Sequence, residues 1–245
     1  MRAAWLVGCV AWLSSCSPTT TGGDAGPQEV PLTLRLVSGD NQFAQADANF
    51  GVPLQIQVLK DGAPYPGVIV VFTAPASEPT AVFDMAGIAR VVTSASGSAS
   101  APPFKAGQRV GSYVVDAVIE GTDTHVEFHL TNTLGAPDNL HVIAGHQQVT
   151  TPDTAFMTAF RVQLRDEPGN PIPGGMVTFT TPSGNAMATC TFDGGLNTVT
   201  ITTDVNGVAL APTCTAGPTT GVFTVAVRGP LNTITESLSL EVAPN

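Results

Sequence analysis

The sequence predicts an all-β protein built from two successive Greek-key β-sandwiches. Short runs of alternating apolar and polar residues recur along the chain, and one order of strands and turns occurs twice. Gly (25) and Pro (20) are frequent, whereas only 11% of the 245 residues are charged. Alternation with a period of two is typical of half-buried strands. Long solvated helices need many charged residues on their outer faces, so this composition disfavours them.

The clearest repeated segment is a Pro-Gly turn followed by a strand that a second proline ends. It spans residues 64–75 (PYPGVIVVFTAP) and again residues 171–182 (PIPGGMVTFTTP), 107 positions later (171 minus 64). Pro and Gly favour a tight turn, and a proline cannot donate to a sheet ladder. The spacing is about the length of one sandwich domain. Alternation predicts four core residues in these strands: Val70, Phe72, Val177 and Phe179.

A first module is expected at residues 30–133. Residues 38–42 (SGDNQ) are expected to form a turn, and residues 60–63 (KDGA) a turn that closes a hairpin onto the repeated strand. Besides that strand, alternation predicts strands around residues 32–37, 54–59, 89–93, 113–118 and 125–130.

A second module is expected at residues 138–243, after a short linker at residues 134–137 (LGAP) that restricts hinge motion. Residues 144–148 (AGHQQ) repeat the first turn at an offset of 106 (144 minus 38). Residues 204–207 (DVNG) are interpreted as a hairpin turn, because the other ligand positions of a calcium loop are missing. Further strands are expected around residues 140–142, 160–165, 208–211, 221–227 and 238–242.

Residues 1–15 have the features of a bacterial lipoprotein signal peptide. An apolar run at residues 3–13 follows Arg2 and is too short to span a bilayer. It leads into Leu-Ser-Ser-Cys, which resembles a lipobox. The resemblance implies that Cys16 carries acyl chains, which would anchor the protein stably in a membrane. Leu-Val-Gly-Cys, which ends at Cys9, matches equally well but leaves a shorter apolar core. An ordinary cleaved signal peptide or a misassigned start codon would also account for this segment.

Residues 16–29 are expected to form a flexible tether, because they contain Thr, Gly, Pro and Asp without apolar periodicity. Ser17 resembles an outer-membrane sorting residue. The sequence therefore predicts an exported, membrane-anchored lipoprotein at the outer membrane or cell surface.

The net charge of −10 disfavours nucleic-acid binding, because an acidic protein repels phosphate backbones. Solubility is the simplest explanation of this charge, and weak Ca²⁺ binding at acidic loops is a second explanation.

The order of motifs resembles the bacterial Ig-like group 1 domain, which builds the stalks of invasin and intimin. The resemblance covers residues 30–243 and implies two tandem immunoglobulin-like sandwiches. No β-barrel anchor or lectin-like tip accompanies the modules, and they lack the Cys-Trp-Cys core of antibody domains. The first-module motifs that carry the resemblance are SGDNQ (38–42), PxPGxxVxFTxP (64–75), SGSASAP (96–102) and GSYVVxA (111–117).

Cys190 and Cys214 are the two cysteines that remain after processing. Because an exported protein folds in an oxidising compartment, we expect them to form a disulfide, with two free thiols as the alternative. Closing a loop of about 25 residues contributes roughly 3 kcal/mol to stability.

No metal or cofactor site is expected. His125, Glu127 and His129 share one strand face, but the outer two lie about 13 Å apart and cannot reach one ion. We interpret them as a solvated sheet face, and His141 and His146 as surface residues.

The sequence contains no nucleophile elbow, metalloprotease helix or phosphate loop, so we expect no enzyme activity. The first hypothesis is a non-catalytic envelope lipoprotein whose modules act as a stalk or an adhesion scaffold, with protein or glycan partners. The second is a glycan-binding or envelope-polymer-binding module that uses loops at one sandwich end. Exposed aromatic residues at that end would distinguish it, and five are candidates: Phe43, Phe50, Tyr65, Phe83 and Phe104.

Overall fold

A computed structural model describes residues 31–84, 86–184 and 187–244. These ranges contain strands and turns, and they hold no helix that is long and apolar enough to cross a membrane. The predictions for the signal peptide, for Cys9 and Cys16, and for the tether concern residues outside the described ranges.

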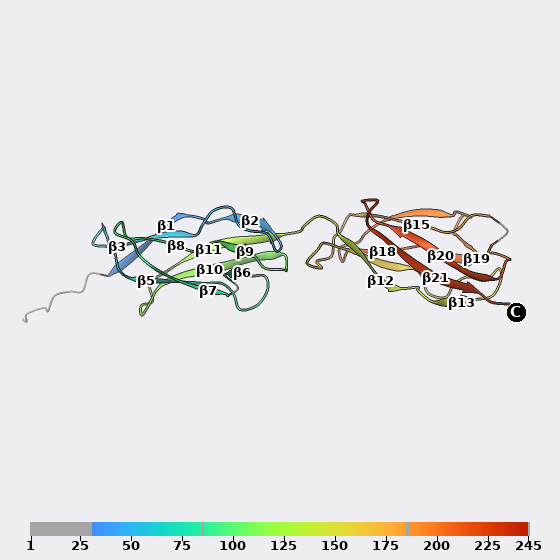
Figure 1. The fold of residues 1–245 in the computed structure, drawn as a ribbon, viewed down its shortest axis with the longest axis horizontal. Coiled ribbons are helices and arrows are strands. Elements are labelled where there is room, and N and C mark those ends of the chain that lie inside the picture. Colours follow the sequence, from blue (N-terminus) through green and yellow to red (C-terminus); the bar gives the residue numbers. More distant parts are fainter. Residues whose placement is uncertain (1–30, 85, 185–186, 245) are drawn as a thin grey trace, which may run out of the picture. The chain divides into compact units, whose positions relative to one another are not determined.

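The first module contains two main sheets with a core between them (Figure 1, blue to green). One sheet has the order β2-β11-β10-β5-β7, and the other has the order β1-β3-β4 with β8 beside β3. A third, small sheet pairs β6 with β9. The strands are β1 (Leu32–Ser38), β2 (Gln42–Gln45), β3 (Gln55–Lys60), β4 (Ala63–Pro64), β5 (Ile69–Thr73), β6 (Ala81–Phe83), β7 (Ile88–Val92), β8 (Ser98–Ser100), β9 (Phe104–Ala106), β10 (Gly111–Ile119) and β11 (His125–Thr133).

The second module repeats this arrangement (Figure 1, yellow to red). Its five-stranded sheet has the order β13-β21-β20-β15-β17, its second sheet the order β12-β14-β18, and β16 pairs with β19. The strands are β12 (Asn139–Ala144), β13 (Gln148–Thr150), β14 (Arg161–Arg165), β15 (Met176–Thr180), β16 (Cys190–Phe192), β17 (Thr198–Thr202), β18 (Val208–Leu210), β19 (Cys214–Ala216), β20 (Gly221–Arg228) and β21 (Thr235–Val242).

Each module has its own hydrophobic core, which confirms the predicted alternation in the repeated strand. Val70, Phe72, Val177 and Phe179 are fully buried, and the strands end at Thr73 and Thr180, just before the expected prolines. Other fully buried large side chains are Leu54, Ile56, Phe83, Phe128 and Leu130 in the first module, and Phe160, Leu164, Phe192, Leu238 and Leu240 in the second.

The turn after β1 transfers the chain from one sheet to the other. Strand β1 pairs antiparallel with β3, whereas β2 pairs parallel with β11 of the five-stranded sheet. Gly39 has a φ of 94°, and a Cβ there would lie 2.6 Å from the Pro53 carbonyl oxygen. Gly145 occupies the same place in the second module, with a φ of 93°. A side chain is therefore excluded at both positions.

Two predicted hairpins are wrong. The turn at residues 60–63 joins β3 to the two-residue β4, and the repeated strand β5 lies in the other sheet. The turn at residues 204–207 joins β17 to β18, which also belong to different sheets. Turn residues determine a local reversal of the chain. The sheet that the next strand joins is decided by the side of the module's core that its apolar face covers.

Candidate functional site

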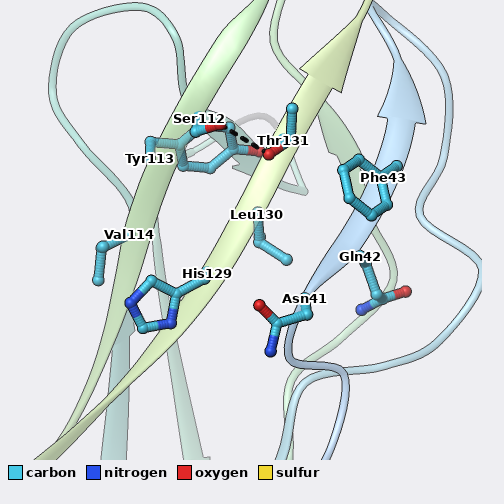
Figure 2. A pocket seen from close by; sticks show the side chains of 9 residues that line it. All are labelled: Asn41, Gln42, Phe43, Ser112, Tyr113, Val114, His129, Leu130 and Thr131. Carbon is cyan, nitrogen blue, oxygen red and sulfur yellow. Dashed lines mark hydrogen bonds between the residues drawn. The ribbon is translucent and has the colours of Figure 1, made fainter.

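A shallow groove of about 390 Å³ lies beside the edge strand β2 of the first module (Figure 2). Phe43 projects from β2 and is 72% exposed, opposite Thr131 of β11. A hydroxyl–hydroxyl hydrogen bond of 2.8 Å joins Thr131 to Ser112 of β10 (Figure 2). The groove is lined by Asn41, Gln42, Phe43, Ser112, Tyr113, Val114, His129, Leu130 and Thr131.

The second module carries a hollow at the equivalent edge, beside β13. Val149 takes the place of Phe43 (149 minus 43 is 106) and is 61% exposed, and Val222 of β20 is 69% exposed. Both modules therefore present an apolar side chain from a short edge strand, a position where another chain can pair with a sheet. The hollow is lined by Gln147, Gln148, Val149, Val222, Ser239, Leu240 and Glu241.

A glutamine fixes this edge strand in each module. The Gln42 side-chain amide donates to the carbonyl oxygens of Gly39 (2.7 Å) and Val52 (2.8 Å), and its Oε1 accepts from the Val52 N–H (2.9 Å). Gln148 makes the same three bonds, to Gly145 (3.0 Å) and to both backbone groups of Thr158 (2.8 Å each). One side chain thus ties the sheet-switching turn to the segment before the next strand.

The two modules use different acceptors at the start of this turn. Asp40 Oδ1 accepts from the His129 N–H at 2.7 Å and lies 3.4 Å from the His129 ring. At the equivalent place in the second module, His146 Nδ1 accepts from the Ser239 N–H at 3.1 Å. A carboxylate in the first module and an imidazole in the second therefore accept the equivalent backbone N–H.

Neither a family profile nor a curated protein matches the sequence. The chain is similar to several solved structures, which include the D0–D1 domains of intimin at 19% identity, covering 86% of this chain and 97% of that one, with a TM-score of 0.31. FdeC, an Escherichia coli adhesin, shares 19% identity over 86% of this chain and 64% of its own, with a TM-score of 0.42. Yersinia pseudotuberculosis InvD shares 19% identity over 87% and 58%, also with a TM-score of 0.42.

Both modules are immunoglobulin-like β-sandwiches. The assignment rests on the strand order, with the first strand divided between two sheets and β10–β11 and β20–β21 forming hairpins in the larger one. This strand order confirms the predicted all-β, immunoglobulin-like fold class.

Four of the five aromatic candidates for a binding surface at the sandwich end are not largely exposed. Phe50, Phe83 and Phe104 are core residues of the first Ig-like module, with the Phe104 ring 4.8 Å from Phe50 and 5.3 Å from Phe83. Tyr65 is half-buried under Lys60, and only Phe43 is largely exposed. The hypothesis of a glycan-binding site at one sandwich end therefore lacks the group of exposed aromatic residues that would have distinguished it.

The residues that the sequence placed on one face of β11 are exposed there. Glu127 lies directly opposite Asp116 of β10, between His125 and His129. His141 and His146 are exposed in the second Ig-like module. In residues 31–84, 86–184 and 187–244, no three His, Cys, Asp or Glu side chains are grouped so that they could hold a metal ion.

Cys190 and Cys214 are joined by a disulfide between β16 and β19, with 5.6 Å between their Cα atoms. Both are buried in the core of the second Ig-like module. In the first module, Ala81 and Phe104 occupy the equivalent positions of β6 and β9. The Phe104 ring therefore fills the space that the disulfide fills in its counterpart.

A buried polar network in the first Ig-like module escaped sequence reasoning. The Tyr113 hydroxyl donates to Asn132 Oδ1 at 2.9 Å, and Asn132 Nδ2 donates to the carbonyl oxygens of Thr80 (3.0 Å) and Arg109 (3.1 Å). Burial, and then the Glu78 carboxylate, raise the pKa of the Tyr113 hydroxyl well above its ordinary value. A polar residue at an alternating core position was the only sequence signal.

A second feature that escaped sequence reasoning is a hollow of about 400 Å³ on the outer face of the larger sheet of the second Ig-like module. Alternating threonines on β15 and β17 were its sequence signal, since they face outward opposite the core residues. It is lined by Thr178, Thr180, Ala226, Arg228, Gly229 and Asn232.

Proposed function

We propose that the protein is a non-catalytic lipoprotein of the cell envelope whose tandem Ig-like modules act as a stalk or interaction scaffold. The observation that supports the scaffold role is the repeated edge groove, which places an exposed Phe43 and an exposed Val149 at equivalent positions of the two sandwiches. The proposed organisation is a signal peptide (1–15), a tether (16–29), two modules (30–133 and 138–243) and a linker (134–137).

The anchor is tested by mass spectrometry of the protein recovered from its native membrane. We expect an acylated N-terminal Cys16, and we expect Cys16→Ala to leave an unacylated chain. Cys9→Ala is the matched control and should leave acylation at Cys16 unchanged. Acylation at Cys9, or an unmodified chain, would contradict the proposal.

The scaffold role is tested by photo-crosslinking on intact cells. A photoreactive side chain at Phe43 or Val149 should capture the same surface protein or polymer repeatedly, because both positions lie on the proposed interaction edge. A probe at Val205 is the control, because Val205 is 85% exposed on the turn after β17, the strand at the opposite edge of the sheet from β13. Equal labelling from all three positions, or none, would refute the interaction edge.

A further inference from the structure

The outer face of the five-stranded sheet in the second Ig-like module is covered with hydroxyl groups around one arginine. In the strand register, Arg228 of β20 lies directly opposite Thr178 on one side and Thr235 on the other. Thr200 continues the same row on β17. Directly opposite residues have Cβ atoms about 5 Å apart, so the guanidinium group is within reach of these hydroxyls.

The next row provides the floor of the hollow. Ala226 lies between Thr180 and Ser237, and its small side chain leaves open space between two hydroxyl-bearing neighbours. The turn after β20 adds Gly229 and the Asn232 amide to the lining. Two hydroxyl pairs hold the wall in place, Thr178–Thr200 at 2.9 Å and Thr180–Thr198 at 3.4 Å.

Arg228 has no salt bridge within the described part of the chain. Glu236 follows Thr235 on β21, but it lies opposite the buried Val227 and so projects from the other face of the strand. Glu241 shares the outer face, six residues further along β21, which is about 20 Å away. The hollow therefore contains one positive charge, and no carboxylate lies beside it on the outer face of the sheet in the described part of the chain.

The first Ig-like module shows that this arrangement is not imposed by the fold. Asp116 lies opposite Glu127 where the second module has Ala226 opposite Ser237, and a valine stands where the second module has Arg228. The residues that correspond to Thr178, Ala226, Arg228, Thr235 and Ser237 are Val71, Asp116, Val118, His125 and Glu127.

We propose that this hollow binds an acidic sugar, with the carboxylate of a uronate unit on Arg228. A guanidinium group pairs with a planar carboxylate through two parallel hydrogen bonds, and a single arginine matches a single negative charge. Threonine hydroxyls and the Asn232 amide can both donate to and accept from sugar hydroxyls. A volume of about 400 Å³ lies in the range of small-ligand sites.

The proposed sugar binding is additional to the scaffold role, and a single copy of the protein can bind the sugar without its lipid anchor. Because an exposed arginine–carboxylate pair contributes little free energy, binding should fall in the millimolar range for a short oligosaccharide. A polysaccharide that carries many uronate units would bind several anchored copies at once and so raise the avidity.

The test is an NMR titration of the isotope-labelled full chain with a short oligogalacturonate. We expect saturable shifts at the Arg228 Nε–H and at the amides of Thr178, Thr180 and Asn232, with the first module unaffected. Arg228→Gln removes the charge at similar length, and Ala226→Asp introduces the acid found in the first module. Each should reduce the affinity by about threefold to fivefold while leaving the melting temperature within a few degrees.

Three further ligands separate this proposal from its competitors. A neutral galactose oligomer of the same length should bind about threefold to fivefold more weakly, and inorganic phosphate and a short acidic peptide should not produce the same set of shifts. Equal binding of the neutral sugar, equal response to phosphate, tighter binding of the peptide, or shifts that persist in Arg228→Gln would each overturn the proposal. None of these results bears on the acylation of Cys16, which tests the anchor separately.

Discussion

Gln42 and Gln148 illustrate what a sequence reveals at the scale of one residue. Each was expected in a turn, and each is instead the first residue of the strand that follows, β2 or β13. Their role as clamps could not be foreseen, because the backbone groups they bind lie ten residues further along the chain and are brought close only by folding. The same holds for Tyr113 and Asn132, whose hydrogen bond joins two strands 19 residues apart.

Replacement of the clamp should destabilise the module that contains it. Gln42→Ala removes two donated bonds and one accepted bond, so we expect a loss of about 1–3 kcal/mol in the free energy of unfolding. Urea denaturation measures this change. Gln45→Ala on the exposed end of β2 is the control, and an equal effect of both substitutions would show that the clamp contributes nothing.

Tyr113 should make stability fall at alkaline pH. Its pKa is raised in the folded state above the ordinary value of 10.0, so its contribution is fully present below pH 10. Above pH 10 the unfolded chain releases the proton and the folded chain retains it, so the free energy of unfolding should fall by up to about 1.4 kcal/mol per pH unit.

Denaturation at several pH values above 10, compared between the original protein and Tyr113→Phe, isolates this effect. The substitution should reduce the slope of the free energy of unfolding against pH. It also leaves Asn132 Oδ1 without its donor and so lowers the free energy of unfolding by about 1–3 kcal/mol at neutral pH. Tyr65→Phe, which removes the other tyrosine, is the control. Identical alkaline slopes for the original protein and Tyr113→Phe would disprove the assignment.

At the scale of elements, alternation was enough to predict the long strands and their buried faces. It failed for pairing, because residues 60–63 and 204–207 specify a reversal of the chain and not the sheet that receives the next strand. It also could not show that the candidate aromatics Phe83 and Phe104 are core residues, because strands β6 and β9 are too short to show a clear period. The edge grooves depend on the parallel pairing of β2 with β11 and of β13 with β21, which no local sequence pattern predicts.

The small sheets β6–β9 and β16–β19 show two ways to fill one space. Removing the disulfide with Cys190→Ala and Cys214→Ala should cost the second module about 3 kcal/mol, because the closed loop spans 24 residues. Cys190→Ala with Cys214→Phe copies the first module and should recover part of this loss. Adding Phe160→Leu, which copies Leu54, should recover more by making room for the new ring. Thermal unfolding measures the stability of each variant. If the variant with Cys214→Phe were no more stable than the variant with Cys214→Ala, a phenylalanine ring would not replace the disulfide in this space.

For the whole molecule, the sequence predicted two modules, and the structure contains two separate cores. Because only the second core holds a disulfide, a reducing agent should act on one module alone. Calorimetry should therefore show two transitions, of which one moves to lower temperature on reduction, by several degrees for a loss of about 3 kcal/mol. A single transition that moves as a unit would mean that the two cores unfold together.

The parallel pairing of the short edge strand with the last strand of each module also has a mechanical consequence. When the ends of a module are pulled apart, β2 and β11 are drawn past each other lengthwise, as are β13 and β21. The hydrogen bonds between them then carry the load together and do not open one after another. Each module should therefore resist unfolding by a force that pulls along its length.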